Sequence, residues 1–568
     1  MVQAVNADVG KRATGGFRGR DTVRFRGHGF GPRTEENQPP GEFAPTGKFG
    51  RMFPSLRGLV PSEEDLRELG AAMVEQDPGS AAGNNTTVPQ GYTYLGQFID
   101  HDVTFDPTAL QEILVDPLAL QNFRTPMLDL DSVYGSGPAA QPYLYDIRDP
   151  DKFLIGTTNQ EPGRGDPNIL PNLPHDLPRA PSGLGLLGDP RNDENLIVAQ
   201  LHLAFLKFHN KIVDGLRGES DESITQISPL RKSIFEEARD LAIWHYQWIV
   251  LHDFLRRILD TEQLDLVLQE GPSFFNISVG KGPSDGHRSH PHAAHPTPFI
   301  PVEFSAAAYR LGHSMVRNVY DYNRVFTPLS DDDRIPPATL QLLFNFTAKS
   351  TELFEDDGVT PRDLPVPIPS DWIIDWRRFF EIDPIQVPVG FSRRLDPFLA
   401  PALTGTGENQ GVPNVPEPNE LALRNLFRGA SLALPPGQSI ARFMGLRPLD
   451  KAEIARGPDG QVAERLGFHV ESPLWYYVLK EAEVRGGGQH LGEVGSRIIA
   501  EVFVGILLAD TSSFLVRNPN WKPTLPAQHP ETFTMVDLLK FVNDISPIDR
   551  RENVKDQNLL IPELIIDP

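Results

Sequence analysis

Apolar residues recur at helical spacing over two long stretches, residues 193–217 and 229–258, and this periodicity constrains the fold more than any other feature. Strand-like alternation is scarce, and the 48 Gly and 54 Pro residues indicate long ordered loops between helices. The sequence therefore predicts a mainly α fold with little β structure. Shorter helices are predicted over residues 62–76, 91–101, 303–317, 335–348, 419–429, 474–484 and 490–509.

The chain of 568 residues contains no internal repeat and no change of composition that marks an independent second domain. Residues 1–50 are rich in Gly, Pro and Arg, and residues 11–33 hold seven basic residues against one acidic residue. We therefore predict an N-terminal arm over residues 1–50 and one large helical domain over residues 51–568. The arm is expected to lie in solvent or against an acidic body, and a nucleic-acid tail is the less favoured alternative.

The composition excludes several classes of protein. The absence of cysteine excludes disulfides, iron–sulfur clusters, thiolate-ligated haem and cysteine nucleophiles. The net charge of −23 argues against nucleic acid or an anionic membrane surface as the main partner. No stretch reaches 18 apolar residues, so no membrane span is expected. The first residues lack an apolar run suited to a signal peptide, which favours the cytoplasm and leaves leaderless secretion open.

The strongest local motif is Gly96–Asp102, within the sequence YTYLGQFIDHDVTFD. On a helix Gln97 and His101 lie four residues apart and share a face, so both can point into one cavity. A His there can accept and return a proton during work on a small polar molecule. Taken alone, the motif is slightly better explained by a buried His whose neighbours satisfy it.

Two further motifs carry basic residues that suit a redox site. Glu303–His313 is rich in small residues and ends with Gly312 beside His313, which lets a bulky planar group approach the backbone. With His101, this pattern is consistent with a haem held by one His and faced by the other. Arg191, ahead of Glu194, can stabilise a developing oxyanion, although the acidic residues after it would equally suit a helix N-terminus.

Oxygen ligands gather in a fourth motif, which favours Ca²⁺. In an extended segment the side chains of Thr125, Asp129 and Asp131 and residue 127 face one way, and hydroxyl, carboxylate and carbonyl oxygens are the ligands that Ca²⁺ prefers. A separate His-rich segment, residues 287–295, could also bind a metal. Its prolines and its Gly- and Pro-rich flanks favour a surface loop instead.

Taken together these motifs resemble those of the animal haem peroxidase family, within the peroxidase–cyclooxygenase superfamily. The resemblance covers residues 41–510 and implies a single large helical haem-peroxidase domain. Five segments carry it in the family's order: GQFIDHD resembles the distal-His motif, DLDSVYGS the calcium loop, RNDEN the distal Arg segment, AAYRLGH the proximal-His motif, and LRNLFR the segment whose Asn holds the proximal His.

The resemblance implies a role for each matching residue. It implies haem b as cofactor, which is ester-linked in many members, and Ca²⁺ as a second cofactor. On the peroxide side His101 is similar to the distal base, Arg191 to the distal Arg, and Gln97 to the residue beside the peroxide and halide site. The other side chains it matches are His313 (axial iron ligand), Asn425 (acceptor for the N–H of His313), Arg428 (near a haem propionate), Asp100 and Glu194 (haem ester links), and Asp102, Thr125, Asp129 and Asp131 with the backbone of Met127 (calcium ligands).

Departures from the family pattern refine this expectation. Asn195 stands where myeloperoxidase-like members have Met, so a sulfonium link and the most oxidising haem are not expected. Asp131 replaces the usual Ser of the calcium loop, and the lack of cysteine indicates a bacterial-type member. Fatty-acid dioxygenase members place a radical Tyr three residues before the proximal His, where this chain has Arg310; Tyr309 is one residue further away.

The expected function is therefore a haem peroxidase. It would reduce H₂O₂ and, through a ferryl intermediate, oxidise bromide, iodide, thiocyanate or phenols, as a monomer or an undetermined oligomer. A haem-dependent fatty-acid dioxygenase that uses Tyr309 or another Tyr is one alternative. A non-enzymatic haem or adhesion protein with a degenerate site is another, and the retention of His101, Arg191 and His313 counts against it.

Overall fold

The computed structural model describes residues 47–105, 121–122, 124–159, 168–218, 232–275, 298–328, 337–344, 346–347, 367–403 and 420–549. Most of the predicted arm and all of the His-rich segment 287–295 lie outside these residues. Among the described residues, no helix combines the length and the apolar character needed to cross a bilayer.

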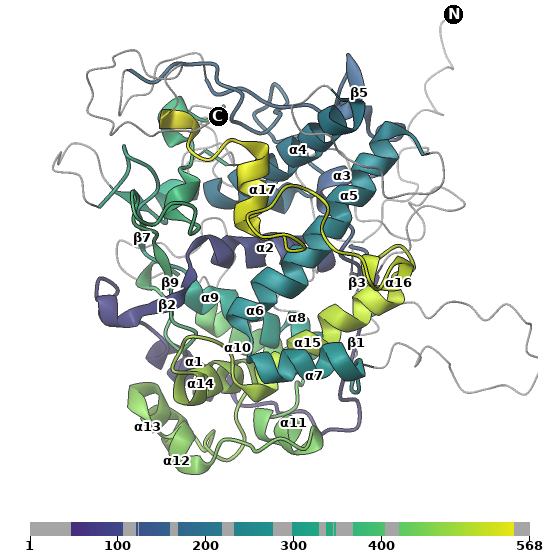
Figure 1. Cartoon of the computed structure of the whole chain (residues 1–568). Coiled ribbons are helices and arrows are strands. Elements are labelled where there is room, and N and C mark those ends of the chain that lie inside the picture. Colours follow the sequence, from purple (N-terminus) through teal and green to yellow (C-terminus); the bar gives the residue numbers. More distant parts are fainter. Residues whose placement is uncertain are drawn as a thin grey trace, which may run out of the picture. The chain divides into compact units, whose positions relative to one another are not determined.

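Helices dominate the described structure (Figure 1). The α-helices are α1 (Glu63–Ala72), α2 (Gly91–Val103), α3 (Asp131–Tyr134), α4 (Leu196–Arg217), α5 (Ile234–Ile249), α6 (Leu255–Ile258), α7 (Thr261–Glu270), α8 (Val302–Ser305), α9 (Gly312–Met315), α10 (Leu421–Ser431), α11 (Gly437–Phe443), α12 (Lys451–Ile454), α13 (Gly457–Arg465), α14 (Leu474–Gly486), α15 (Glu493–Ala509), α16 (Phe514–Arg517) and α17 (Met535–Val542). The π-helical segment η6 (Val250–Phe254) joins α5 to α6, and the 3₁₀ turns are η2 (Ala81–Gly83), η4 (Pro142–Leu144), η5 (Pro190–Asp193), η8 (Ala308–Leu311), η9 (Leu342–Phe344), η10 (Ser370–Trp372), η11 (Trp376–Arg378), η12 (Pro401–Leu403) and η13 (Pro547–Asp549).

The β structure within the same residues is limited to short strands, which confirms the predicted mainly α class. In the three-stranded sheet, β1 lies between an antiparallel neighbour, β3, and a parallel neighbour, β6. The other strands pair two by two and antiparallel, β2 with β9, β4 with β5, and β7 with β8. The strands are β1 (Gly47–Gly50), β2 (Asn84–Pro89), β3 (Gln121–Asn122), β4 (Tyr145–Asp146), β5 (Asp149–Phe153), β6 (Phe299–Pro301), β7 (Val319–Tyr320), β8 (Ala338–Thr339) and β9 (Phe391–Arg393).

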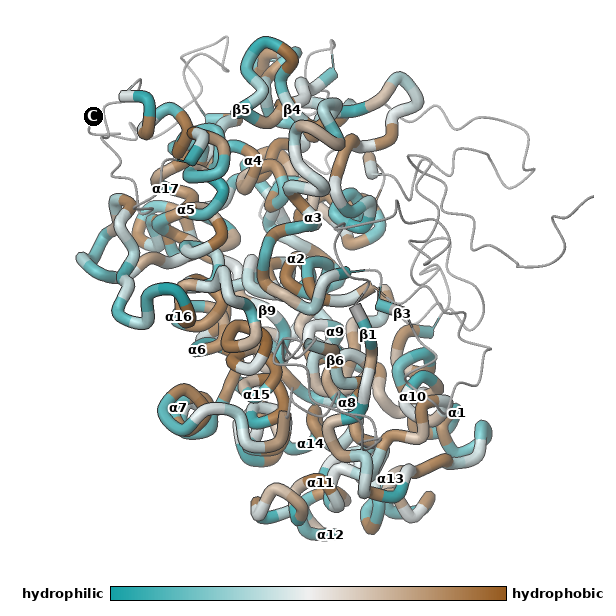
Figure 2. Tube along the Cα trace, turned by 90° about the vertical axis from the view of Figure 1, so that its right-hand side faces the viewer, coloured by the Kyte–Doolittle hydropathy of each residue, from teal (hydrophilic) through white to brown (hydrophobic). Residues whose placement is uncertain are grey.

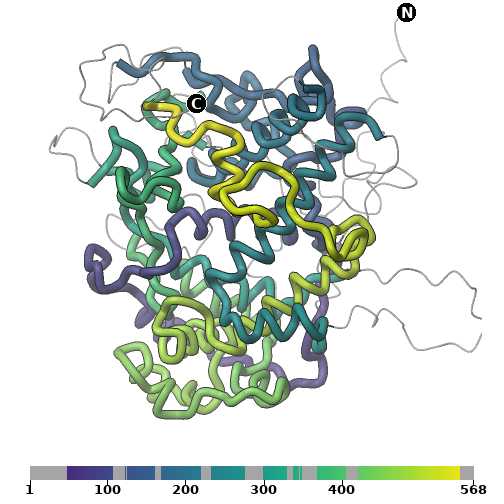
Figure 3. Tube along the Cα trace, viewed as in Figure 1, coloured from purple at the N-terminus to yellow at the C-terminus, as the bar shows by residue number. Residues whose placement is uncertain are grey.

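The helix α4 is largely buried and packs against α2, α5 and α17; Figures 1 and 3 show α4 and α5 side by side. Its ends are set by local chemistry. The side chain of Asn195 accepts hydrogen bonds from the N–H groups of Ile197 and Val198, and Gly218 ends the helix in the left-handed conformation. The apolar stretch 193–217 thus forms a helix that starts at Leu196, because residues 190–193 form the 3₁₀ turn η5 instead.

The other buried helices match the predicted segments closely. The helix α15 is apolar along most of its length, as its brown colour in Figure 2 indicates, and it packs against α7 and α14. The stretch 229–258 contains α5, η6 and α6 in succession, and α5 opens with a capping box in which Ser233 and Glu236 satisfy each other's N–H groups. The sequence did not predict α3, α7, α11, α12, α13, α16 or α17 as helices.

Two predicted helices are wrong. Residues 303–317 do not form one helix: α8, η8 and α9 follow each other with a break at Ala307. Tertiary contacts compete for the backbone there, because Arg310 Nε donates to the carbonyl of Ser305 and Trp475 Nε1 to that of Arg310. Within the predicted helix 335–348, the described residues instead form β8, which pairs with β7, and the turn η9.

Candidate functional site

A cavity of about 420 Å³ lies between α2, the start of α4, the η8–α9 segment and α10. That volume falls within the range of small-molecule and cofactor sites. Of the predicted site residues, the cavity is lined by Gln97, Asp100, His101, Arg191, Glu194, His313 and Arg428. Asn425 and the predicted calcium ligands do not line it.

His101 is buried, and a network that the sequence did not reveal orients its ring. Nδ1 lies 2.9 Å from Oδ1 of Asn192, whose Nδ2 lies 2.9 Å from Nδ1 of His202. Burial, and next the charge of Arg191, lower the pKa of His101, and burial lowers the pKa of His202 to about 3. With both rings neutral, Asn192 donates to His202 and accepts the N–H of His101 Nδ1. The Nε2 lone pair of His101 is then available as a base.

Arg191 lines the cavity with most of its guanidinium already engaged. Nε and Nη2 donate to Asp189, and Nη2 also donates to the carbonyls of His101 at 3.0 Å and Thr104 at 2.6 Å. The guanidinium lies over the ring of Phe105, 4.4 Å from its centroid. Among the described residues no hydrogen bond engages Nη1, so this nitrogen can donate to a ligand.

Gln97 is held by two residues from the other side of the cavity. Its Nε2 donates to Oε2 of Glu194 at 3.4 Å, and its Oε1 accepts from Nδ2 of Asn195 at 3.1 Å. The same Oε2 of Glu194 lies 3.9 Å from Nε2 of His101. Asn195 therefore has two functions, since its Oδ1 caps α4 while its amide nitrogen orients Gln97. The sequence showed only that a Met is absent there.

On the opposite side, His313 contacts Asn425 as predicted, but with the donor and acceptor exchanged. Nδ2 of Asn425 lies 2.8 Å from Nδ1 of His313, whereas the prediction required the amide oxygen to face an N–H of the ring. The amide plane has to turn for Asn425 to accept that hydrogen bond. Burial, and next Arg310, lower the pKa of His313 to about 3, so the ring is neutral and can act as a metal ligand.

Three arginines make this side of the cavity positive. Arg310, Arg424 and Arg428 all line it, and only Arg428 was predicted to. Burial, and next the charges of Arg310 and Arg428, lower the pKa of Arg424, which indicates that the three cations lie close enough to repel each other. Such a cluster favours a ligand with carboxylate groups.

These features fit a haem group. Two neutral His side chains line one cavity, and a Cβ built at Gly312, beside His313, would meet no atom within 4 Å. The arginine cluster suits propionates. Asp100 and Glu194 bring two carboxylates to the same cavity, and Oδ1 of Asp100 accepts from the Thr104 hydroxyl at 2.8 Å. A planar dianionic cofactor thus finds ligands, counter-charges and space.

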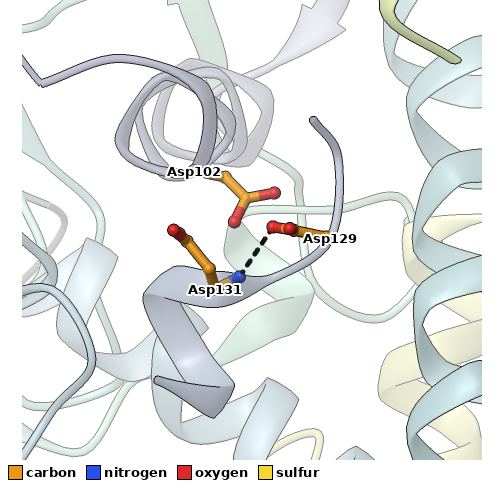
Figure 4. Close-up of side chains that lie close together, drawn as sticks. All are labelled: Asp102, Asp129 and Asp131. Carbon is orange, nitrogen blue, oxygen red and sulfur yellow. Dashed lines mark hydrogen bonds between the residues drawn. The ribbon is translucent and has the colours of Figure 1, made fainter. Parts of the chain in front are cut away.

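The predicted calcium residues gather beside α2, where one oxygen from each of Asp102, Asp129 and Asp131 lies within 4.8 Å of the others (Figure 4). Burial, and next the charge of Asp131, raise the pKa of Asp129 to about 7, while burial and then Asp129 raise that of Asp102. Thr125 donates to Asp129 at 3.0 Å. Three carboxylates this close favour a divalent cation with oxygen ligands.

The three residues Asp102, Asp129 and Asp131 are called the acidic triad below. The guanidinium of Arg124 contacts this triad. Nη1 of Arg124 donates to Oδ1 of Asp131 at 3.0 Å. Arg124 therefore offsets part of the charge of Asp131. The sequence offered no signal for this contact, because Arg124 precedes the predicted ligands and matches none of the motifs.

Comparisons with known proteins point to a peroxidase family. A family model described as animal haem peroxidase matches residues 111–359. Thyroid peroxidase of Canis lupus familiaris is 28% identical over 240 residues, which are 40% of this chain and 22% of that protein. Chorion peroxidase of Drosophila melanogaster is 25% identical over 320 residues, 56% of this chain and 33% of that protein. The chain thus spans only about a fifth to a third of these curated relatives.

The fold is also found in solved structures. Peroxidase A from Dictyostelium discoideum superposes with a TM-score of 0.52 at 16% identity, over 90% of this chain and 95% of that one. Fatty acid alpha-dioxygenase from Oryza sativa does so with a TM-score of 0.51 at 15% identity, over 88% of this chain and 79% of that one. At these identities the likeness concerns the fold alone.

Proposed function

We propose that the chain is a haem peroxidase that reduces hydrogen peroxide and oxidises a small donor, because residues 111–359 match the animal haem peroxidase model and the relatives it resembles include thyroid and chorion peroxidases. The observation that carries the proposal is the single cavity lined by two neutral histidines, His101 and His313, with Arg191 beside the first. Haem bound there would supply the iron redox chemistry, while the protein supplies ligands, proton transfer and electrostatics.

In this proposal His101 transfers the proton and Arg191 stabilises the negative charge. Nε2 of His101, left free by the contact of Nδ1 with Asn192, takes a proton from hydrogen peroxide and returns it to the departing oxygen. Nη1 of Arg191 donates to the oxygen on which negative charge develops as the O–O bond breaks. Because the pKa of His101 is lowered from its ordinary value of 6.5, this base is neutral at pH 6.5 and above.

The opposite side of the cavity would hold the cofactor. His313 would hold the haem iron through a ring nitrogen, and Asn425, with its amide oxygen turned toward Nδ1–H, would fix the tautomer and make the ring a stronger ligand. Arg428, with Arg310 and Arg424, would pair with the propionates. Asp100 and Glu194 are the carboxylates available for ester links to haem methyl groups.

Ca²⁺ is proposed as the second cofactor. Asp102, Asp129 and Asp131 would supply carboxylate oxygens, Thr125 its hydroxyl and Met127 its backbone carbonyl, a set of hard ligands suited to this ion. Asp102 directly follows His101 on α2, so the ion would brace the helix that carries the proposed base.

The donor is proposed to be bromide, iodide, thiocyanate or a phenol. Gln97 lines the cavity with an amide that Asn195 and Glu194 hold, and it is the group that would meet a small donor beside the peroxide. Asn195 cannot form the thioether-derived link of myeloperoxidase-like members, so a less oxidising haem and weak chloride turnover are expected.

One absorption spectrum tests the proposal most directly. The purified protein should show a Soret band that changes within seconds of adding H₂O₂ and recovers when bromide or a phenol is supplied. Mass spectrometry of a peroxide-treated digest should find haem attached to peptides that contain Asp100 or Glu194. A protein that binds no haem when reconstituted would contradict the proposed function.

A fatty-acid dioxygenase is the second candidate, because Tyr309 lines the same cavity. Its ring stacks on Phe304, and its hydroxyl donates to the carbonyl of Gly96 at 3.3 Å. Oxygen uptake with linoleate in the absence of peroxide, lost in Tyr309→Phe, would favour this candidate over the peroxidase.

A further inference from the structure

A buried carboxylate outside the cavity joins two arginines. Asp189 is fully buried and accepts hydrogen bonds from Arg124 Nε at 2.8 Å and from Arg191 Nη2 at 2.8 Å. It also caps η5 by accepting from the backbone N–H of Arg191 at 2.8 Å. A buried charge is stable only when it is paired and hydrogen-bonded, so the three side chains form one unit.

One end of this unit reaches the acidic triad. Arg124 is almost completely buried, and its nitrogens are shared between Asp189, Asp131 and the carbonyl of Gly188. The contact with Asp131 is 3.0 Å long. Any divalent cation that binds the triad therefore meets Arg124 as a competitor for the carboxylate of Asp131.

The other end of the unit holds Arg191, whose side chain lines the cavity. Asp189 engages Nε and Nη2 of Arg191, the two nitrogens on one edge of the planar guanidinium. Because the group is rigid and flat, fixing that edge fixes the direction of Nη1. Stacking on Phe105 holds the plane itself.

We propose that Asp189 is a positioning residue for Arg191, and that the bridge Arg124–Asp189–Arg191 couples cation binding at the acidic triad to ligand binding in the cavity. A cation on Asp131 weakens its contact with Arg124, Arg124 pairs more fully with Asp189, and the hold of Asp189 on Arg191 changes. This inference rests on the proposed haem and Ca²⁺ sites.

A second route between the sites runs along α2, where Asp102 of the triad directly follows His101. The two routes are separable by mutation. Arg124→Gln removes the charge that contacts both Asp131 and Asp189, and it leaves the side chains of the second route, Asp102 and His101, unchanged. Asp189→Asn keeps the η5 cap but removes the charge that holds both arginines.

A closely matched control exists elsewhere in the chain. Asp375 is also fully buried, caps the 3₁₀ turn η11 and pairs with two arginines, Arg377 and Arg378. Neither the cavity nor the triad contains any of these three residues. Asp375→Asn therefore reproduces the loss of a buried bridging charge without touching either site.

The experiment measures the dissociation constant of cyanide for the haem protein by absorbance, with saturating Ca²⁺ and after removal of Ca²⁺ by EGTA. In the wild type and in Asp375→Asn we expect Ca²⁺ to change this constant by about fivefold or more, the lower range of typical coupling between sites. In Arg124→Gln and Asp189→Asn the ratio should fall below about twofold. If Asp189→Asn does not fold, Arg124→Gln still decides.

The possible results separate this inference from the proposed function. If Ca²⁺ changes the cyanide dissociation constant of Arg124→Gln as much as that of the wild type, the coupling runs along α2 and the bridge is wrong. The bridge is also wrong if Ca²⁺ does not change this constant in the wild type. Absence of a Soret band would instead refute the proposed function. Calorimetric Ca²⁺ titration then tests the bridge without haem: Arg124→Gln should bind Ca²⁺ more tightly than Asp375→Asn, and equal or absent binding overturns it.

Discussion

Replacing Asn192 by Asp should move the pH dependence of the peroxide reaction. Asn192 is fully buried, and its Oδ1 lies 2.9 Å from Nδ1 of His101. In the wild type, burial and the charge of Arg191 lower the pKa of His101 below 6.5, so the base remains neutral at that pH and its acid limb lies lower. A carboxylate at position 192 would favour the protonated ring instead.

The expected size follows from the contact. An opposite charge within hydrogen-bonding distance raises the pKa of a His by about 1–3 units, or roughly 1.4–4 kcal/mol of preference for the cation. The sign is unambiguous, because only the neutral ring accepts a proton and a higher pKa removes that form as pH falls. The acid limb of the rate should therefore move to a pH higher by about 1–3 units, with little change on the alkaline side.

Stopped-flow absorbance measures the rate of reaction with H₂O₂ from about pH 4 to about pH 9, which covers the titration of His. The acid limb of this pH–rate profile is then read directly. Asn84→Asp is the control, since Asn84 accepts from Arg317 and Arg393, which tolerate a carboxylate, and does not line the cavity. An acid limb in Asn192→Asp that coincides with those of the wild type and the control would refute the contact between Asn192 and the base.

Three further predictions follow from the same geometry. His313→Ala should lose stable haem, seen as loss of the Soret band, whereas His101→Ala should keep it and react with peroxide about 10²-fold more slowly; a normal rate would remove His101 from the mechanism. Removal of Ca²⁺ by chelation should lower the melting temperature and alter the haem spectrum through Asp102, and native protein free of calcium by metal analysis would argue against the site. Steady-state assays at matched peroxide and pH should give faster bromide than chloride turnover, and equal rates would show that the argument from Asn195 is wrong.

Much of the site could be predicted because it lies within short segments whose local geometry the residue types dictate. Gln97 and His101 share a helix face by their spacing of four residues, and the oxygen-rich segment from Thr125 to Asp131 brings two of its carboxylates together. The resemblance to a family then ordered these segments and assigned roles. The structure brings His101, Arg191 and His313 to one cavity, although no single motif contains them all.

The sequence by itself determined the helical class, because long runs of apolar residues at helical spacing have to bury one face. It also determined the local motifs and the absence of any thiol chemistry. Only the tertiary structure decided that Ala307 breaks a helix, that Asn192 orients His101 against His202, and that Asp189 holds two arginines. These contacts form because buried polar groups need hydrogen-bond partners, and the partners lie 65 or 91 residues away in the sequence. Such distant pairs produce no periodic pattern from which they could be predicted.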